Sequence, residues 1–581
     1  MSKIFNLSVN ELFITVDSLV KAGKTPAEVG TLYNDWLTQN GNGADSAPAW
    51  FNFGVILAGE NLKSQAQACY VKALSLKRDF WQAAANLANL LEAEGKEEEA
   101  IDIYRQFLPL DIDTEGKLHI RNQLGRLVEN RRDFPEATQL YYESLSIDPN
   151  QDGPFQHWFN VRQKQCEWPL ETFVKPITTG DLAEKIGPIA SMAYFDDPTL
   201  LNQACTSWIE RFKKGKNYRH LADKKYNHQK LRIGYLSCDF RAHAVCFLNC
   251  QMFSMHNRDQ FEIFGFDFSK EEDTPWRKMV IQGMDHHIPI HSLDDETAAT
   301  LIRKFEIDIL VDLVGLTSGA RPGILLYKPA PIQVSYLGFL GPVGMPEINY
   351  IVCDDYVIPP EQAHHYGAKP LYVPFYQVNN QLRASAPMPT RESLGLPEDA
   401  FVYCAINNSY KMTPAVFRRW MTILDRTQNT VLWMLAENPQ VEANIRKEIK
   451  KYGISEDRVV FARHAQPSEY LARFACADLF LDSSPYNAGI TGSDAVWMGL
   501  PVLTCPGNTY VSRMAADLML KLNMPEFVCS TWAQYIDKAV DFSKTKTAKS
   551  IMASKMDRNS FVFNSKFFIE ALERKFIEIA R

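Results

Sequence analysis

The sequence lacks paired cysteines, long apolar runs and a strong excess of either charge. Its eleven cysteines are scattered with no Cys-x-x-Cys pair, so we expect reduced thiols and no metal site built from cysteine. No run approaches the roughly 18 apolar residues that cross a membrane, and polar residues interrupt 4–20, where a signal peptide would be continuously apolar. The formal net charge of −7 is too small to indicate nucleic-acid binding. These absences predict a cytoplasmic protein without membrane or nucleic-acid partners.

The chain of 581 residues is too long for a single hydrophobic core. Its composition, 46% hydrophobic and 23% charged, is typical of globular proteins. A change of pattern near residue 231 separates a helical part from an α/β part. We therefore predict a repeat region over 1–150, a helical linker over 151–230, a first α/β lobe over 231–385, and a second α/β lobe with C-terminal helices over 386–581.

Small and aromatic residues recur at a spacing of about 34 in the first part of the chain, the period of tetratricopeptide repeats. Each repeat is a pair of antiparallel helices, and three pairs suffice for a stable stack. We expect residues 11–40 to form a further, degenerate pair at its start. The concave face of such a solenoid binds proteins or peptides, so we predict a protein partner there. The recurring positions are Gly54 and Tyr70, Ala88 and Tyr104, and Gly125 and Tyr141.

From Leu231 onward, short β-rich runs alternate with helical segments, a pattern typical of buried parallel strands. Two groups of strands, joined by the proline-containing segment 371–397, predict two lobes with a cleft at the carboxyl ends of their strands, where open parallel sheets bind ligands. The predicted strands are 231–237, 261–268, 307–313, 332–337 and 350–353 in the first lobe, and 401–406, 430–435, 459–461, 479–481 and 501–504 in the second. The predicted helices include 294–305, 414–426 and 439–452.

The segment from Leu481 to Asp494 is the most informative part of the sequence. A strand ends at Leu481, a loop of small and polar residues follows, and a helix starts near Thr491, a residue type that caps helices. The free amide hydrogens at a helix start attract phosphate. Asp494, about one turn further, can accept hydrogen bonds from ribose hydroxyls. The segment therefore predicts a nucleotide pocket.

Two further side chains are expected in the same cleft because each follows a strand. Lys411 comes after a strand and an Asn-Asn-Ser turn and before a helix opened by Thr413 and Pro414, so its ammonium can neutralise a leaving diphosphate. His243 follows the first strand of the first lobe, and its imidazole can take a proton from an attacking hydroxyl or bond a sugar. A cation and a helix start can replace a divalent ion, so we predict a site without metal.

Six short blocks follow the repeats in order: Cys166-Glu167-Trp168, Asp239 to His243, Lys328 to Gln333, Asn407 to Lys411, the loop ending in Asp494, and Gly507 to Arg513. Together they resemble the O-linked N-acetylglucosamine transferase family and its bacterial relatives, over nearly the whole chain. The resemblance implies an α/β GT-B fold of two Rossmann-like lobes after the all-α tetratricopeptide repeat region. It also implies inverting transfer from a UDP-sugar donor to Ser or Thr of a protein, with no cofactor besides that donor.

The resemblance also implies roles for single residues. In the family, the residue matching Lys411 neutralises the leaving diphosphate, and the residue matching His243 lines the active site. Asn408 matches a position that touches the nucleotide, although an asparagine also suits a plain turn. Gly338 and Gly341 permit close approach of the main chain to the sugar, as they would permit an ordinary turn.

Further positions match the nucleotide-binding residues of the family. Tyr470 stands where the family often has a histidine against uracil, and an aromatic ring keeps stacking possible. Ala465 matches a position whose backbone pairs with the base, and Arg473 matches an arginine beside the uridine; either residue also suits ordinary helix surface. The positions near the diphosphate and the ribose are Asn487, Thr491 and Asp494.

The chain departs from the family pattern in the phosphate loop, where Gly489-Ile490-Thr491 replaces a common His-Thr-Thr, and Leu340 and Ala244 replace common prolines. We predict UDP-N-acetylglucosamine as the donor, with UDP-glucose, or GDP-fucose as in the SPINDLY branch, as alternatives. A non-catalytic peptide-binding scaffold with a decayed site is the rival hypothesis, against which the retained lysine, histidine and aspartate argue. A sugar-nucleotide epimerase is disfavoured because it has no evident need of the repeats.

Overall fold

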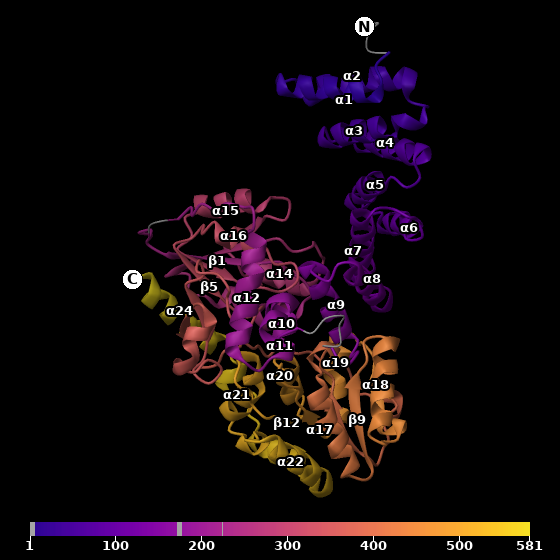
Figure 1. Ribbon diagram of the computed structural model, residues 1–581. Helices are drawn as coiled ribbons and strands as arrows, with labels where there is room; N and C mark the ends of the chain where they lie inside the picture. The colour runs from indigo at the N-terminus through magenta and orange to yellow at the C-terminus, as the bar shows by residue number, and fades with distance from the viewer. Residues whose placement is uncertain (1–5, 171–176, 223–224) are drawn as a thin grey trace. The chain divides into compact units, whose positions relative to one another are not determined.

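The computed structural model describes residues 6–170, 177–222 and 225–581 of the chain. The chain divides into two compact units, residues 1–161 and 162–581. The described part of the first unit contains helices and no strand, whereas the second unit contains two parallel sheets (Figure 1).

The predicted helical repeats are confirmed in the first unit. A Cβ atom on Gly54 would lie 2.7 Å from the ring of Tyr70, and one on Gly125 would lie 2.8 Å from the ring of Tyr141. The glycines therefore recur because each faces an aromatic ring of the paired helix. The helices are α1 (Val9–Lys21), α2 (Pro26–Asn40), α3 (Ala47–Gly59), α4 (Lys63–Leu76), α5 (Trp81–Ala93), α6 (Glu97–Phe107), α7 (Thr114–Asn130) and α8 (Phe134–Ile147).

The predicted extra pair at the start of the repeats is present as α1 and α2. Leu12 of α1 packs in one cluster with Tyr33 and Trp36 of α2, and Ala49 of α3 belongs to the same cluster. The extra pair is therefore joined to the first repeat by a continuous apolar core.

Four helices lie within the predicted linker over 151–230 and end at Lys213, and the described residues 214–222 and 225–230 form no helix. The block around Cys166 packs on the second lobe: the Cys166 thiol approaches the Ser409 carbonyl oxygen at 3.6 Å, and the Trp168 ring lies 5.6 Å from the Phe417 ring, centroid to centroid. The helices are α9 (Asp152–Lys164), α10 (Thr179–Ile186), α11 (Pro188–Tyr194) and α12 (Pro198–Lys213).

The first lobe is a seven-stranded parallel sheet in the order β3-β2-β1-β4-β5-β6-β7. All five strands predicted for this lobe are present, and α15 (Asp295–Lys304) is the predicted crossover helix. The strands are β1 (Leu231–Ser237), β2 (Phe261–Asp267), β3 (His286–Pro289), β4 (Ile309–Asp312), β5 (Ile332–Ser335), β6 (Tyr350–Cys353) and β7 (Lys369–Tyr372).

The two edge strands of this sheet, β3 and β7, were not predicted. Both are short and only partly buried, and each contains a proline, which edge strands tolerate. The last two residues of β7 lie in the predicted connecting segment 371–397. In β3, His286 contacts Glu262 at 2.8 Å and His287 contacts Asp267 at 2.9 Å, so these histidines have structural partners.

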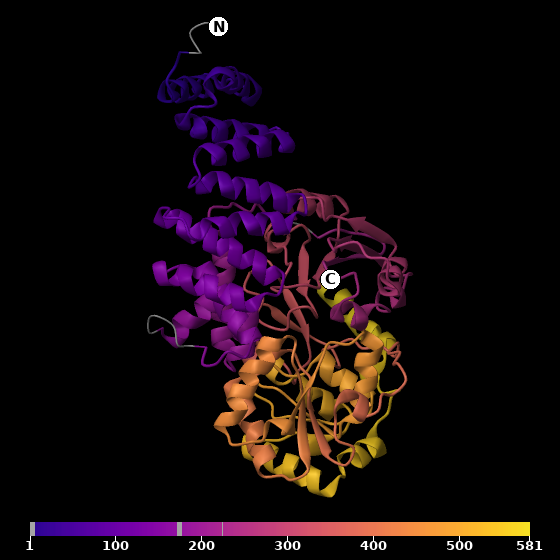
Figure 2. The same cartoon turned by 90° about the vertical axis from the view of Figure 1, so that its right-hand side faces the viewer.

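The second lobe is a five-stranded parallel sheet in the order β10-β9-β8-β11-β12. All five predicted strands are confirmed, and helices flank the orange strands on both sides in Figure 2. The strands are β8 (Phe401–Ala405), β9 (Thr430–Leu435), β10 (Val459–Ala462), β11 (Leu479–Leu481) and β12 (Val502–Leu503). The helices include α17 (Pro414–Asp425), α18 (Pro439–Lys451), α19 (Pro467–Arg473), α20 (Ile490–Trp497), α21 (Met514–Lys521) and α22 (Trp532–Thr545).

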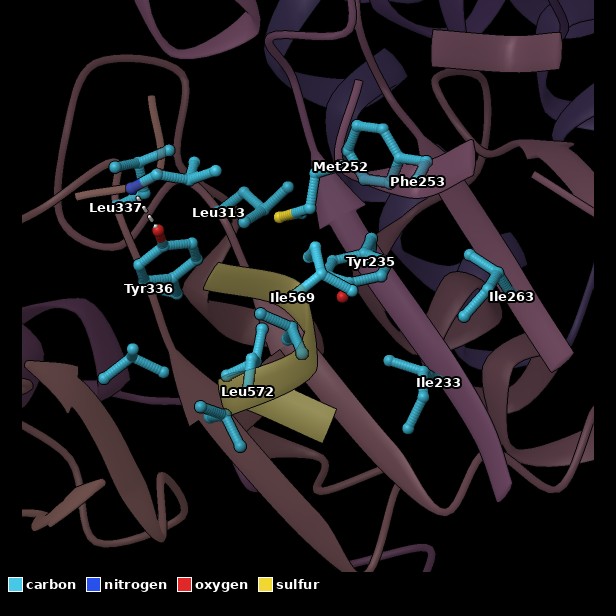
Figure 3. Packing of buried hydrophobic residues seen from close by; sticks show 14 of the residues in the cluster. Ile233, Tyr235, Met252, Phe253, Ile263, Leu313, Tyr336, Leu337, Ile569 and Leu572 are labelled. Atoms are coloured by element: carbon cyan, nitrogen blue, oxygen red, sulfur yellow. Dashed lines mark hydrogen bonds between the residues drawn. The ribbon is translucent and has the colours of Figure 1, made fainter. Parts of the chain in front are cut away.

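The last helix, α24 (Ser565–Ala580), returns to the first lobe. Ile569 and Leu572 lie in the same buried cluster as Tyr235 of β1 and Leu313 (Figure 3). Glu573 accepts hydrogen bonds from the Asn257 amide at 2.7 Å and contacts His256 Nδ1 at 3.0 Å. The lobes are therefore tied together by the end of the chain as well as by the segment before β8.

Candidate functional site

The loop between β11 and α20 is organised by Asp482, the first residue after the strand. Its Oδ1 accepts hydrogen bonds from the amides of Ser483 (2.9 Å) and Ala488 (2.7 Å), and its Oδ2 accepts one from Thr504 Oγ1 (2.7 Å). These bonds close residues 483–488 into a compact turn ahead of α20. Asp482 was not among the predicted site residues.

The predicted cap of α20 is wrong. The helix begins at Ile490 with Gly489 as its N-cap and has no side-chain cap hydrogen bond. Thr491 is already the second helical residue, and its side chain lies beside that of Tyr470. The amides of the first turn are consequently not bonded by a cap side chain, which preserves the predicted attraction for an anion.

Lys411 and Asn487, predicted separately, are brought together. Lys411 ends the short helical turn after β8, and its Nζ donates a hydrogen bond to the Asn487 carbonyl oxygen at 3.1 Å. The same Nζ lies 3.9 Å from the centroid of the Tyr486 ring, a cation–π contact. Burial lowers the pKa of Lys411 to about 8, an effect that the charge of Asp482 opposes. A cation therefore lies on the loop that the sequence predicts to bind a diphosphate.

The loop after β8 is bonded to the loop after β11 by Asn407, one residue before the predicted Asn408. Asn407 is buried, and its Nδ2 donates to Ser483 Oγ at 2.9 Å. Asn408 is exposed, and its carbonyl oxygen accepts from the Lys411 amide at 3.0 Å. Asn408 thus forms the turn, and the predicted contact of its side chain with a nucleotide stays a prediction.

Three predicted residues, Tyr470, Arg473 and Thr491, form a second group beside the phosphate loop. Tyr470 lies beside Thr491, and the Arg473 guanidinium carbon lies 4.9 Å from the centroid of the Tyr470 ring. Arg473 is 5% exposed and donates to the Arg463 carbonyl oxygen at 2.8 Å, so it is not ordinary helix surface. Ala465 is exposed in the loop before α19, where its backbone remains a candidate for pairing with a base.

Asp494 has a partner that the sequence did not reveal. Arg383 Nη1 lies 3.0 Å from Asp494 Oδ1, and the two side chains are 7% and 13% exposed. Arg383 Nη2 also donates to Asn379 Oδ1 at 2.7 Å and to Ser493 Oγ at 3.1 Å. Burial raises the pKa of Asp494, and the Arg383 charge opposes that rise. The predicted ribose ligand is therefore one half of a buried ion pair.

His243 is the N-cap of α13 (Ala244–Asn249), directly after the turn that follows β1. Its Nδ1 lies 3.3 Å from Asp239 Oδ2 and 3.4 Å from the Val245 amide nitrogen. Burial lowers its pKa and Asp239 opposes this, so the ring is neutral at pH 7. Nδ1 accepts the hydrogen bond from the Val245 amide, so the proton of the neutral ring lies on Nε2. The role of general base, which needs a free ring lone pair, therefore stays a prediction.

The two predicted glycines face protein atoms. A Cβ atom on Gly338 would lie 2.1 Å from the Leu313 carbonyl oxygen, and one on Gly341 would lie 2.9 Å from the Phe339 ring and 3.0 Å from Met192 Sδ. Close packing therefore requires glycine at both positions. Their approach to a sugar stays a prediction.

The chain belongs to glycosyl transferase family 41, because a model of that family matches residues 202–379 and 376–572, more than half of its length. A tetratricopeptide repeat model matches residues 47–80, the first repeat pair.

Within the described ranges, no group of three or more His, Cys, Asp or Glu side chains is placed to hold a metal ion. None of the described helices combines the length and apolar character needed to cross a membrane.

Individual relatives agree with the family. The chain is 32% identical over 362 residues to a probable UDP-N-acetylglucosamine-peptide N-acetylglucosaminyltransferase, SEC, from Arabidopsis thaliana, covering 60% of this chain and 37% of that protein. It is 26% identical over 428 residues to a UDP-N-acetylglucosamine-peptide N-acetylglucosaminyltransferase from Caenorhabditis elegans, covering 54% and 37%. The chain thus spans less than two fifths of the length of these relatives.

A solved structure shows the same fold. An O-GlcNAc transferase mutant from Thermobaculum terrenum matches with a TM-score of 0.66 at 20% identity, covering 92% of this chain and 98% of that chain. The fold prediction, an all-α repeat region followed by two α/β lobes of GT-B type, is therefore confirmed.

Proposed function

We propose that this protein transfers N-acetylglucosamine from UDP-N-acetylglucosamine to Ser or Thr hydroxyls of other proteins. The observation that carries the proposal is the placement of Lys411 on the loop that leads into α20, beside the group formed by Tyr470, Thr491 and Asp494. A cation and a helix start meet there, as a leaving nucleoside diphosphate requires. Membership of family 41 and the names of its relatives support the choice of donor.

The reaction is an inverting displacement without a metal. The acceptor oxygen attacks the anomeric carbon from the face opposite the diphosphate, a new carbon–oxygen bond forms, and the bond to the phosphate oxygen breaks. Lys411 and the first amides of α20 stabilise the departing UDP. His243 takes the hydroxyl proton, or bonds the donor sugar while another base accepts that proton.

The helical repeats supply the acceptor in this proposal. Stacked helix pairs present an extended surface that suits a polypeptide, and a hydroxyl acceptor on a protein must be carried to a site that otherwise needs only a nucleotide sugar. The protein acts in the cytoplasm and uses no cofactor besides its donor. The acceptor rests on the repeats, the lack of a cofactor on the resemblance, and the cytoplasmic location on the scattered cysteines.

One observation on the phosphate loop favours two alternative functions. Gly489 and Ile490 remove an imidazole and a hydroxyl from the phosphate loop, which favours either another donor, UDP-glucose or GDP-fucose, or a scaffold without catalysis. The protein should be incubated with UDP-N-acetylglucosamine, UDP-glucose and GDP-fucose, with and without a protein extract as acceptor. Donor hydrolysis and a mass increase of about 203 Da per site, the residue mass of an N-acetylhexosamine, support the proposal. If none of the three donors is turned over, the proposal is wrong and the non-catalytic peptide-binding scaffold is favoured.

A further inference from the structure

Asp482 and Lys411 hold neighbouring residues of one loop. The Asp482 carboxylate accepts the Ala488 amide at 2.7 Å, while the Lys411 ammonium donates to the Asn487 carbonyl oxygen at 3.1 Å. Asp482 is 1% exposed, and its three hydrogen-bond donors come from the loop itself and from Thr504 after β12. A negative and a positive group therefore fix the same turn from two adjacent strands, β11 and β8.

We propose that Asp482 is a positioning residue for the transfer: its carboxylate closes the 483–488 turn and supplies the counter-charge that keeps Lys411 as an ammonium ion facing the diphosphate. The inference rests on the proposed function, because it assigns Lys411 to the leaving group. Asp482 itself has no direct contact with the donor in this account. It acts through Lys411 and the turn.

The charges of the two groups depend on each other. Burial lowers the pKa of Lys411 to about 8 while Asp482 opposes the change, and burial raises the pKa of Asp482 to about 7 while its hydrogen bonds and Lys411 oppose that change. The other titratable groups that interact with the pair have raised pKa values: about 12 for Tyr486, about 11 for Cys505, and well above 10 for Tyr376 and Tyr535. Between pH 6 and 9.5, the titrations that matter here are therefore those of Lys411 and Asp482.

The protonated Lys411 sets the direction in which the affinity for UDP changes with pH. A diphosphate binds the protonated lysine, so the affinity for UDP falls as the pH rises through the pKa of Lys411 in the free protein. Without the Asp482 charge the burial of Lys411 is unopposed, and its pKa falls further. The pH at which UDP affinity begins to fall must then move to lower pH.

The experiment is calorimetric titration of the full chain with UDP from pH 6 to 9.5. Asp482→Asn is the central variant, because an amide oxygen can accept the Ser483 and Ala488 amides while its NH2 group donates to the Thr504 hydroxyl. We expect the wild-type affinity to break near pH 8, and the break in Asp482→Asn to lie lower by about one pH unit or more, the usual effect of losing one nearby opposite charge. The ionisation of UDP is common to all variants and cancels.

Two matched variants separate charge from loop structure. Ser483→Ala removes the hydroxyl that donates to the Tyr486 carbonyl oxygen at 2.6 Å and accepts from Asn407, but it leaves both charges in place, so the break should stay near pH 8. Thr504→Val removes a donor to Asp482 Oδ2, weakens its anionic form, and should move the break in the same direction as Asp482→Asn by a smaller amount. Thr504→Val also provides the test of the charge if Asp482→Asn fails to fold.

The outcomes distinguish this inference from the proposed function. Failure of the wild type to bind UDP at every pH overturns the proposed donor and the inference together. UDP binding with a break that stays near pH 8 in Asp482→Asn and in Thr504→Val overturns the inference alone. An equal downward shift in Ser483→Ala also overturns it, because the turn and not the charge would then set the protonation of Lys411.

Discussion

Arg383 and Asp494 form a buried ion pair, with Arg383 Nη1 3.0 Å from Asp494 Oδ1. Asp494 is the predicted ribose ligand in α20, and Arg383 comes from the segment that crosses between the lobes. The pair also reaches Ser493 and Asn379 through Arg383 Nη2. The orientation of the carboxylate that would meet the ribose is therefore set by a residue 111 positions earlier in the chain.

Arg383→Met should destabilise the protein by about 3 to 5 kcal/mol, the usual cost of leaving one partner of a buried pair alone. Asp494 already has a raised pKa, and without Arg383 its pKa rises further. A raised folded-state pKa gives stability that is present at low pH and is lost as the pH rises, so the deficit should shrink at acid pH. Thermal unfolding at pH 5 and pH 8 measures this.

Arg426→Met is the matched control. It breaks an exposed pair in which Arg426 Nη1 lies 2.7 Å from Asp537 Oδ1, and exposed pairs contribute only about 0 to 1 kcal/mol. A deficit in Arg383→Met that is equally small, or that is the same at both pH values, would show that the Arg383 charge does not compensate Asp494.

Lys411→Met tests the cation without opening a cavity. We expect kcat/KM for transfer to fall by about 2.7 to 4 kcal/mol in transition-state stabilisation, the range for one preorganised electrostatic donor. Folding should survive near neutral pH, because Asp482 can bind a proton once its counter-charge is gone. Activity assays together with thermal unfolding at pH 7 separate the two effects.

Lys549→Met serves as its control, since Lys549 is also a partly buried lysine of the second lobe and donates to the Ala475 carbonyl oxygen at 2.8 Å. Its loss should leave kcat/KM near the wild-type value. If Lys411→Met melts normally and turns over as fast as Lys549→Met, Lys411 has no part in the mechanism.

The sequence predicted the strands of both sheets because buried parallel strands are continuous apolar runs, and it missed the edge strands β3 and β7, which are short and half-polar. It placed Lys411 in the same cleft as the loop that ends in Asp494 because loops at the carboxyl ends of parallel strands converge, whereas Asn487 came from the family resemblance. It missed Arg383 and the return of α24 because neither has a local signature: each is defined by a partner far along the chain. The exact start of α20 was mistaken because Gly489, not Thr491, is its N-cap.

UDP should bind in the presence of a chelator with the same affinity as in magnesium or manganese, because Lys411 and the first turn of α20 supply the positive potential. Calorimetry in chelator, then with each ion restored, measures this. Binding that disappears in chelator and returns with either ion would contradict the assignment of the diphosphate to lysine and helix.

Removal of the repeat helices should separate donor chemistry from acceptor selection. A chain of residues 151–581, which keeps α9 whole and removes the repeat helices α1 to α8, should keep UDP affinity and donor hydrolysis, which need only the second unit. Transfer to intact proteins should fall sharply. A soluble truncation that glycosylates protein acceptors at the full rate would show that the repeats do not select them.

The phosphate loop itself offers the last test, because its two departures from the family differ in structural role. Gly489 has a negative φ of −75°, and a Cβ there would meet only Met514 at 3.4 Å and more distant atoms, so a side chain fits. Ile490 packs against the apolar cluster of the first lobe. Restoring the histidine is therefore compatible with the fold, whereas restoring the threonine sacrifices contact between the lobes.

Gly489→His should tighten UDP binding, since one hydrogen bond to a charged phosphate is worth about 1.5 to 3 kcal/mol before reorganisation costs. Gly489→Leu adds bulk without a donor and should bring no gain. Ile490→Thr should lower the melting temperature, because losing buried apolar atoms costs about 1 kcal/mol or more. Its new hydroxyl should tighten UDP binding only slightly. If Gly489→His binds UDP no better than Gly489→Leu while the wild type binds GDP tightly, the loop is built for another donor and the assignment of UDP-N-acetylglucosamine is wrong.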